Sequence, residues 1–233
     1  MGEELLGQAV AITLDGGRRT TAMRYAAPAS AASTLRIVLA HGAGAGQRHP
    51  FITGIARQLA ATGIEVWTFN FLYMEQKRRA PDTAPALEHC FRRAIDVAQA
   101  SSGKPAALLI GGKSMGGRIA THLAAQGDRV NGVFALGYPL HPPGKPEQLR
   151  SAHLPAITVP VLIVQGERDA FGTPSELAPV IATMKAPVTL AVVSGGDHSL
   201  GVRGQPADEL YAWLANLIAN WARTSAGKTE RRS

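Results

Sequence analysis

The sequence of 233 residues has a single cysteine, Cys90, and no long apolar run. One cysteine allows no disulfide within the chain, which fits a reducing compartment. No stretch approaches the roughly 18 uninterrupted apolar residues that a membrane helix needs. The first ten residues, MGEELLGQAV, carry acidic residues where a secretory signal has basic ones, and they lack its apolar segment. We therefore expect a cytoplasmic protein that does not use a membrane.

Acidic residues are scarce relative to basic ones: 17 Asp and Glu stand against 24 Lys and Arg, a formal net charge of +7 at pH 7. Such an excess raises the question of an anionic partner. The densest basic clusters, at residues 77–79 and 228–232, are short, separated and free of interleaved aromatic residues. A surface that stacks nucleic-acid bases needs such aromatic residues. We interpret the clusters as solvated surface and expect no nucleic-acid partner.

Short apolar runs alternate with helical patterns along the chain, which is typical of a largely parallel sheet covered by helices. Two runs on either side of Asp15, Gly16 and Gly17 predict an opening hairpin. The expected strands are residues 10–14, 20–25, 35–40, 65–71, 106–110, 130–136, 161–164 and 188–193. We therefore predict an α/β fold in which a mostly parallel, eight-stranded sheet has helices on both faces.

No internal repeat and no linker long enough to separate domains interrupts this alternation. Thr173 to Glu176 combine a capping box with a proline at the first helical position, so a helix is expected to begin there. We predict one domain over residues 1–223. Beyond Arg223 the sequence becomes polar, and residues 224–233 are expected to form a disordered tail.

A serine lies in the turn Gly112-Lys113-Ser114-Met115-Gly116, between an apolar strand and an amphipathic helix. In this strand–turn–helix setting a nucleophilic serine takes a strained conformation and points above the sheet. Glycines at both ends of the turn avoid collisions with the neighbouring strand and helix. The pattern predicts Ser114 as a nucleophile, although the same serine could simply cap the helix.

Phosphate binding is the competing interpretation of this turn, because Gly112-Lys113-Ser114 also matches the end of a P-loop. That motif needs a glycine five positions before Gly112, where Ala107 stands inside the predicted strand. The glycine-rich segment 42–46 likewise misses the dinucleotide fingerprint, because Gln47 stands where its third glycine belongs. We expect no cofactor and no metal.

A serine nucleophile needs a base to accept its proton and an acid to orient that base. With this type of turn the chain order is serine, then Asp or Glu, then His, on loops after later strands. Asp169 follows the strand at 161–164 and His198 follows the strand at 188–193, so the order is correct. We predict Ser114, Asp169 and His198 as a catalytic triad, with Glu167 as the alternative acid. Each residue taken singly could also be an ordinary loop residue.

Acyl transfer also needs hydrogen-bond donors for the developing oxyanion. The backbone N–H groups of Met115 and Ala43 are the expected donors, unless the glycine-rich segment is only a flexible turn. Five further residues are candidates for substrate binding near the mouth of the site: His41, Gly42, Arg48, Lys113 and His141. Each could equally be plain surface.

Together these segments resemble the α/β-hydrolase superfamily, and in particular its dienelactone-hydrolase-like branch. The resemblance is carried by residues 41–46, 111–118, 166–169 and 196–198, which span almost the whole chain. Residues 137–146, GYPLHPPGKP, are similar to a narrower group of compact bacterial hydrolases. That group is similar to the hydrolase-like subunits of a eukaryotic histone-acetyltransferase complex.

The resemblance implies the same roles for the triad and for the two oxyanion donors. Dienelactone hydrolase proper has a cysteine where this chain has Ser114, so its particular substrate is not expected here. Many hydrolases of this fold insert a helical lid at the position of residues 141–158, but these 18 residues suffice only for a loop and one helix. We therefore expect an open site without a lid domain.

The leading hypothesis is a carboxylesterase-like serine hydrolase that acts on a small-molecule ester through an acyl-enzyme, as a monomer or homodimer. A thioesterase or a peptidase with the same triad is the nearest alternative. From another class, a non-catalytic interaction protein could retain the hydrolase fold for its surface.

Overall fold

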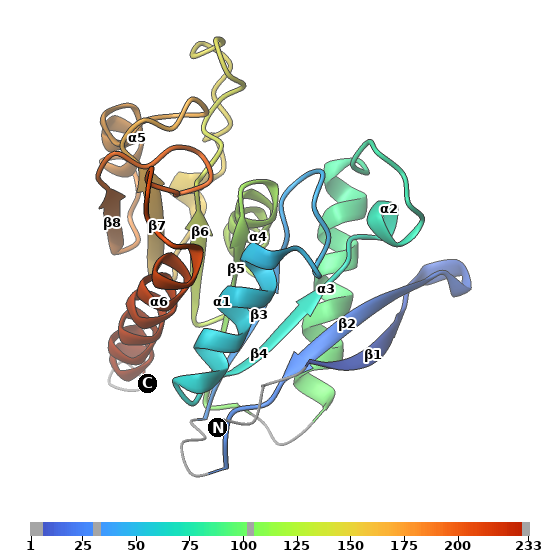
Figure 1. The fold of residues 1–233 in the computed structure, drawn as a ribbon. Coiled ribbons are helices and arrows are strands. Elements are labelled where there is room, and N and C mark those ends of the chain that lie inside the picture. The colour runs from blue at the N-terminus through green and yellow to red at the C-terminus, as the bar shows by residue number, and fades with distance from the viewer. Residues whose placement is uncertain (1–6, 30–33, 102–104, 230–233) are drawn as a thin grey trace.

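The computed structural model describes residues 7–29, 34–101 and 105–229, in which a central sheet has helices on both faces (Figure 1). The strands lie in the order β1-β2-β4-β3-β5-β6-β7-β8. Their bounds are β1 (Gln8–Thr13), β2 (Arg19–Tyr25), β3 (Leu35–Ala40), β4 (Glu65–Phe69), β5 (Ala107–Lys113), β6 (Gly132–Leu136), β7 (Val161–Gly166) and β8 (Val188–Val193).

Strand direction changes only at one end of this sheet. β1 pairs antiparallel with β2, and β2 pairs antiparallel with β4. All other neighbouring strands are parallel. A short 3₁₀ turn, η1 (Asp15–Gly17), joins β1 to β2, with Gly16 and Gly17 at φ of 70° and 74°. The opening hairpin and the eight-stranded, mostly parallel sheet predicted from the sequence are thus confirmed.

Several strand ends differ from the prediction by one to three residues, and the differences at the ends of β4 and β5 lie at the carboxyl edge of the sheet. β4 stops at Phe69 because the N–H of Phe71 donates to His41 Nε2 (3.0 Å) instead of a neighbouring strand, and the short helix α2 (Leu72–Glu75) follows. β5 continues past Ile110 through Gly111 and Gly112, which pair with β3. The glycines extend the strand up to the serine turn.

Helices α1 (Pro50–Ala61) and α6 (Ala207–Thr229) cover one face of the sheet, and α3 (Ala84–Ala100), α4 (Met115–Ala125) and α5 (Pro174–Ile181) cover the other (Figure 1). Each face has its own cluster of buried apolar side chains. The central strands β3, β5, β6 and β7 are buried along almost their full length, as expected for parallel strands covered on both sides.

The start of α5 carries the predicted capping box. The Thr173 hydroxyl accepts from the N–H of Glu176 (3.4 Å), and the Glu176 carboxylate accepts from the N–H of Thr173 (2.7 Å). Pro174 occupies the first helical position, where its missing N–H costs nothing.

The end of α6 corrects the expectation of a disordered tail from residue 224. The helix continues to Thr229, and residues 230–233 lie outside the described residues. The Thr224 hydroxyl donates to the carbonyl of Trp221 (2.9 Å), and Ser225 is buried. A polar composition was misleading here because these small side chains still pack and bond within the helix.

The segment 141–158, where a lid was judged absent, holds only a loop and the 3₁₀ turn η2 (Leu154–Ala156). It projects beyond the carboxyl edge of the sheet without forming a domain over it (Figure 1). No helix within the described ranges is long and apolar enough to cross a membrane.

Candidate active site

Ser114 occupies the sharp turn between β5 and α4, with φ 49° and ψ −114°. A positive φ is unfavourable for a residue with a side chain and is retained where the surroundings enforce it. A Cβ on Gly112 would lie 2.5 Å from the Ala40 carbonyl oxygen, and one on Gly116 would lie 2.6 Å from that of His41. Only glycine therefore fits at these two positions, which allows the turn to pack against β3.

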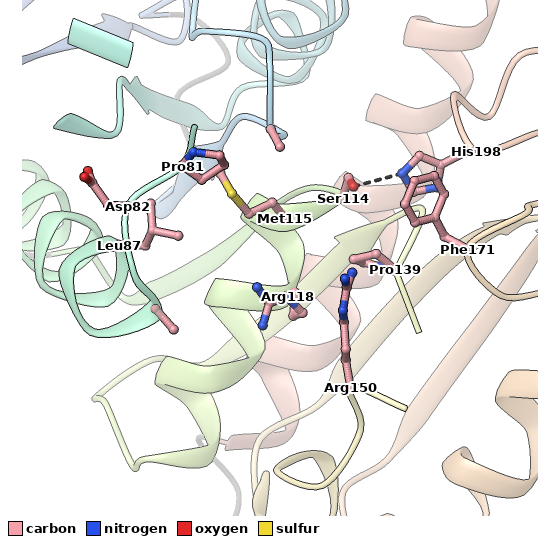
Figure 2. A pocket seen from close by; sticks show the side chains of 12 residues that line it. Pro81, Asp82, Leu87, Ser114, Met115, Arg118, Pro139, Arg150, Phe171 and His198 are labelled. Atoms are coloured by element: carbon pink, nitrogen blue, oxygen red, sulfur yellow. Dashed lines mark hydrogen bonds between the residues drawn. The ribbon is translucent and has the colours of Figure 1, made fainter. Parts of the chain in front are cut away.

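The turn brings the Ser114 hydroxyl to within 2.8 Å of His198 Nε2 (Figure 2). The other ring nitrogen of His198, Nδ1, lies 2.8 and 2.9 Å from the two carboxylate oxygens of Asp169. A carboxylate can only accept, so Nδ1 carries the proton and Nε2 is free to accept the serine proton. The three residues come from the ends of β5, β7 and β8, so only the folded sheet edge joins them.

The Asp169 carboxylate is fully buried and is held by two further donors. Gln165 Nε2 donates to Oδ2 (2.8 Å), and the N–H of Phe171 donates to Oδ1 (2.8 Å). The amide oxygen of Gln165 accepts from the N–H of Tyr138 (2.8 Å), which fixes the amide orientation. These bonds leave the carboxylate no freedom to turn away from His198.

Neither of the other nearby acids contacts the His198 ring. Glu167, the alternative acid, is exposed and accepts from the Ser194 hydroxyl (3.0 Å) and the N–H of Gly195 (2.6 Å). Asp197 accepts from the N–H (2.8 Å) and the hydroxyl (2.6 Å) of Ser199. Both carboxylates stabilise turns around His198 rather than the imidazole itself.

Ala43 and Met115, whose backbone N–H groups are the expected oxyanion donors, line the same cavity as Ser114. Within the described residues, neither N–H donates a hydrogen bond to a protein acceptor. Met115 is also the first residue of α4, where the helix dipole favours negative charge. A role of these two N–H groups in stabilising an oxyanion stays a prediction.

His41 lies behind this loop and is completely buried. The N–H of Phe71 donates to its Nε2 (3.0 Å), and so Nδ1 carries the proton and donates to the Gly42 carbonyl (2.7 Å). Burial lowers the pKa of His41 to about 4, which keeps the ring neutral at physiological pH. The ring connects the glycine-rich loop to the end of β4.

Two cavities meet at Ser114 and His198. The larger, about 450 Å³, includes Arg118, Arg150 and Phe171 in its lining, and Figure 2 shows its side chains. The smaller, about 430 Å³, is lined mainly by apolar and small side chains. Its lining is Gly42, Ala43, Ala45, His49, Phe51, Ile52, Lys113, Ser114, Asp197, His198 and Ser199.

Comparison with known proteins shows the family of this chain. A family model described as "Alpha/beta hydrolase domain" matches residues 33–225. The chain belongs to this α/β-hydrolase family. The superfamily that the sequence resembles is thereby confirmed.

Solved structures similar to this α/β hydrolase share its fold along nearly the whole chain. An alpha-beta serine hydrolase homologue from Coxiella burnetii is 16% identical with a TM-score of 0.74, covering 94% of this chain and 99% of its own. An a/b serine hydrolase without lid from Xanthomonas campestris is 18% identical with a TM-score of 0.74 and covers 93% and 95%. Dienelactone hydrolase from Anabaena variabilis is 17% identical with a TM-score of 0.73 and covers 94% and 97%. At such identities the likeness shows the fold alone, and one neighbour shares the absence of a lid.

Of the five residues expected to bind substrate in the hydrolase, two line a cavity at Ser114 and three do not. Gly42 and Lys113 line the smaller cavity. Arg48 is exposed and lines neither cavity, while His41 is buried behind the loop. His141 is also buried, with Nδ1 bonded to the Pro142 carbonyl (2.8 Å) and Nε2 3.3 Å from Glu176. Arg48, His41 and His141 line neither cavity, and a role in substrate binding stays a prediction for all five residues.

Sequence reasoning missed several residues that shape the site of the hydrolase. Gln165 carried a signal, since it is the single polar side chain within the apolar strand β7. Phe171 stacks on the His198 ring with centroids 4.1 Å apart, and nothing in its loop indicated this. Arg118 and Arg150, which line the larger cavity, are far apart in sequence and had no common pattern. Among the described residues, no group of His, Cys, Asp and Glu is arranged to hold a metal ion.

Proposed function

We propose that this α/β hydrolase cleaves carboxylic esters through an acyl-enzyme formed on Ser114. The observation that carries the proposal is the 2.8 Å contact between His198 Nε2 and the Ser114 hydroxyl, continued from Nδ1 to Asp169. A serine is a weak nucleophile unless a base in hydrogen-bond reach takes its proton. Membership of a hydrolase family supports the same interpretation.

In the first half-reaction the Ser114 oxygen attacks the ester carbonyl carbon while its proton moves to His198 Nε2. The carbonyl oxygen becomes an oxyanion, and the N–H groups of Met115 and Ala43 are the donors proposed to stabilise it. The ester C–O bond then breaks, and the imidazolium returns the proton to the departing alcohol oxygen. The acyl group remains bonded to Ser114.

In the second half-reaction water takes the place of the alcohol. His198 removes its proton, the hydroxide adds to the acyl carbon, and Ser114 leaves with that proton from the imidazolium. Asp169 stabilises the positive ring in both halves and keeps the proton on Nδ1. Gln165 and the Phe171 N–H support this by holding the carboxylate in place.

The test is labelling by a fluorophosphonate together with turnover of p-nitrophenyl acetate. The wild type is expected to be labelled and to hydrolyse the ester, whereas Ser114→Ala should lose at least about 10⁴-fold in kcat. Ser101→Ala is the matched control, because Ser101 is exposed and its hydroxyl donates only to the Ala98 carbonyl (3.0 Å). Undiminished hydrolysis by Ser114→Ala would exclude the assigned nucleophile.

An oxyester, a thioester and an anilide that share one acyl group separate the proposed activity from thioesterase and peptidase chemistry. The proposal expects the highest kcat/KM on the oxyester. A wild-type protein that is neither labelled nor active on any of the three would favour a non-catalytic role for the fold.

A further inference from the structure

Two arginines, Arg118 and Arg150, line the larger cavity beside Ser114 (Figure 2). Backbone hydrogen bonds hold the main chain of both residues in place. Arg118 lies one helical turn after the serine, and its N–H donates to the Ser114 carbonyl (3.0 Å). Arg150 comes from the loop after β6, where its N–H donates to the Leu140 carbonyl (2.7 Å) and its own carbonyl accepts from the Tyr138 hydroxyl (2.7 Å). Ser114, Arg118 and Arg150 therefore line one cavity of about 450 Å³.

Neither of these two arginines bonds directly to a carboxylate among the described residues. Within the described residues, neither arginine forms an ion pair, and Arg118 Nε is buried without a hydrogen-bond partner. The nearest polar contact of the Arg118 guanidinium is His122 Nε2, at 3.5 Å. Burial is the main cause that lowers the pKa of Arg118. Tyr138 and Glu88 act to raise this pKa, whereas the charge of Arg150 acts to lower it, so the two cations oppose each other.

Two acidic side chains, Asp82 and Glu88, lie near this pair of arginines, and both already accept hydrogen bonds from other groups. Asp82 lines the far end of the cavity, where it accepts from Arg78 and from the N–H of Tyr73 (3.1 Å). Glu88 bonds His122 Nδ1 (2.9 Å) and Gln126 Nε2 (3.0 Å), so it is linked to Arg118 only through the His122 ring. Neither carboxylate bonds directly to Arg118 or Arg150.

We propose that Arg118 and Arg150 bind a carboxylate carried by the ester substrate, a specificity that rests on the proposed esterase function. A guanidinium presents two parallel N–H donors that match the two oxygens of a carboxylate. The substrate then has its anionic end in the larger cavity and an apolar part in the smaller one, against Phe51 and Ile52. The net charge of +7 favours the approach of such an anion.

The carboxylate can belong to either side of the scissile ester, and two pairs of substrates separate these cases. For the acyl side, mono-4-nitrophenyl adipate is compared with 4-nitrophenyl hexanoate. For the alcohol side, 4-acetoxybenzoate is compared with its methyl ester. The variants are Arg118→Gln and Arg150→Gln. Arg129→Gln is the control, since Arg129 is exposed in the loop after α4 and its loss removes the same charge.

For one of the two pairs, each cavity variant is expected to lower kcat/KM for the anionic ester by roughly 10- to 100-fold. The neutral partner should change less than about threefold, which also shows that the variant is folded, and the preference should weaken as salt is added. Equal effects on anionic and neutral esters in both pairs, or an Arg129→Gln effect of the same size, would overturn the proposal. A further outcome is a wild type that shows no preference for the anionic ester, while Ser114→Ala loses turnover of the neutral ester. That result would support the proposed esterase function and exclude only the carboxylate site.

Discussion

Lys113 Nζ donates a hydrogen bond to the backbone carbonyl oxygen of His198, across 2.5 Å. Lys113 directly precedes Ser114 in the chain, so this bond ties the serine turn to the loop that carries the base. The ammonium also lies 5.9 Å from the centroid of the Phe51 ring. Burial lowers the pKa of Lys113 to about 8, while Asp169 and Asp197 act against this shift. Lys113, a candidate for substrate binding by sequence, thus directs its ammonium at a backbone carbonyl while it lines the smaller cavity.

Replacing Lys113 by methionine should therefore lower kcat rather than raise KM. The apolar side chain keeps the volume but loses the bond to the His198 carbonyl, and small displacements of a catalytic group cost about 10- to 100-fold in rate. Steady-state kinetics on p-nitrophenyl acetate measure both constants. Lys145→Met is the matched control, because Lys145 is exposed in the loop 141–158. An unchanged kcat with a raised KM would return Lys113 to the role of a substrate ligand.

His41 should make the protein sensitive to acid. Its pKa of about 4 in the folded state lies below the 6.5 of a free imidazole, so between these values the unfolded chain binds more protons. The free energy of unfolding is expected to fall as pH drops from 6.5 toward 4, by up to about 1.4 kcal/mol per pH unit. Protonation also removes the acceptor for the Phe71 N–H, which loosens the loop with Gly42 and Ala43.

Urea unfolding at pH 7 and pH 5 measures this effect, with His41→Asn as the variant that cannot titrate. The variant is expected to be less stable at pH 7 but to lose less stability on acidification. His153→Gln provides a comparison, because burial also lowers the pKa of His153 to about 4 and its ring lies away from the glycine-rich loop. It should reduce the acid sensitivity as well, but only His41→Asn should lower esterase activity at pH 7. Equal pH dependence in His41→Asn and the wild type would contradict the buried neutral state.

Gln165 should matter for the base although it touches no substrate. Gln165→Leu removes the donor to Asp169 Oδ2 and the acceptor for the Tyr138 N–H, both in the buried interior. We expect a loss of about 10-fold or more in kcat and about 2 to 4 kcal/mol in the free energy of unfolding. The downfield ¹H resonance of the His198 Nδ1 proton should weaken, since the carboxylate that accepts it is no longer fixed.

Gln148→Leu is the control for this change, because Gln148 is exposed and bonds only through its backbone N–H to the Lys145 carbonyl (3.0 Å). It should leave the resonance and kcat unchanged. A Gln165→Leu protein that loses stability but keeps the resonance and the rate would limit Gln165 to a structural role.

Much of the site was predictable because its elements are local. The turn around Ser114 can be recognised from glycine spacing and from the strand and helix on either side. The positions of Asp169 and His198 follow from chain order, since parallel strands bring their carboxyl ends to one edge. The absence of a lid follows from the length of the segment 141–158. The end of α6 was misjudged because composition alone does not report the burial of Ser225.

The amino-acid sequence by itself determined the parallel sheet, the family, and the three residues proposed as the triad, because periodicity, glycine spacing and chain order are properties of neighbouring positions. The tertiary structure alone decided which side chains support them. In the folded chain His41 lies in the interior, and the Lys113 ammonium donates to the His198 carbonyl. Arg118 and Arg150 line one cavity. Such contacts join residues from different loops, and they depend on the direction in which each side chain leaves the sheet edge. That direction is set by packing across the whole domain, which no local pattern encodes.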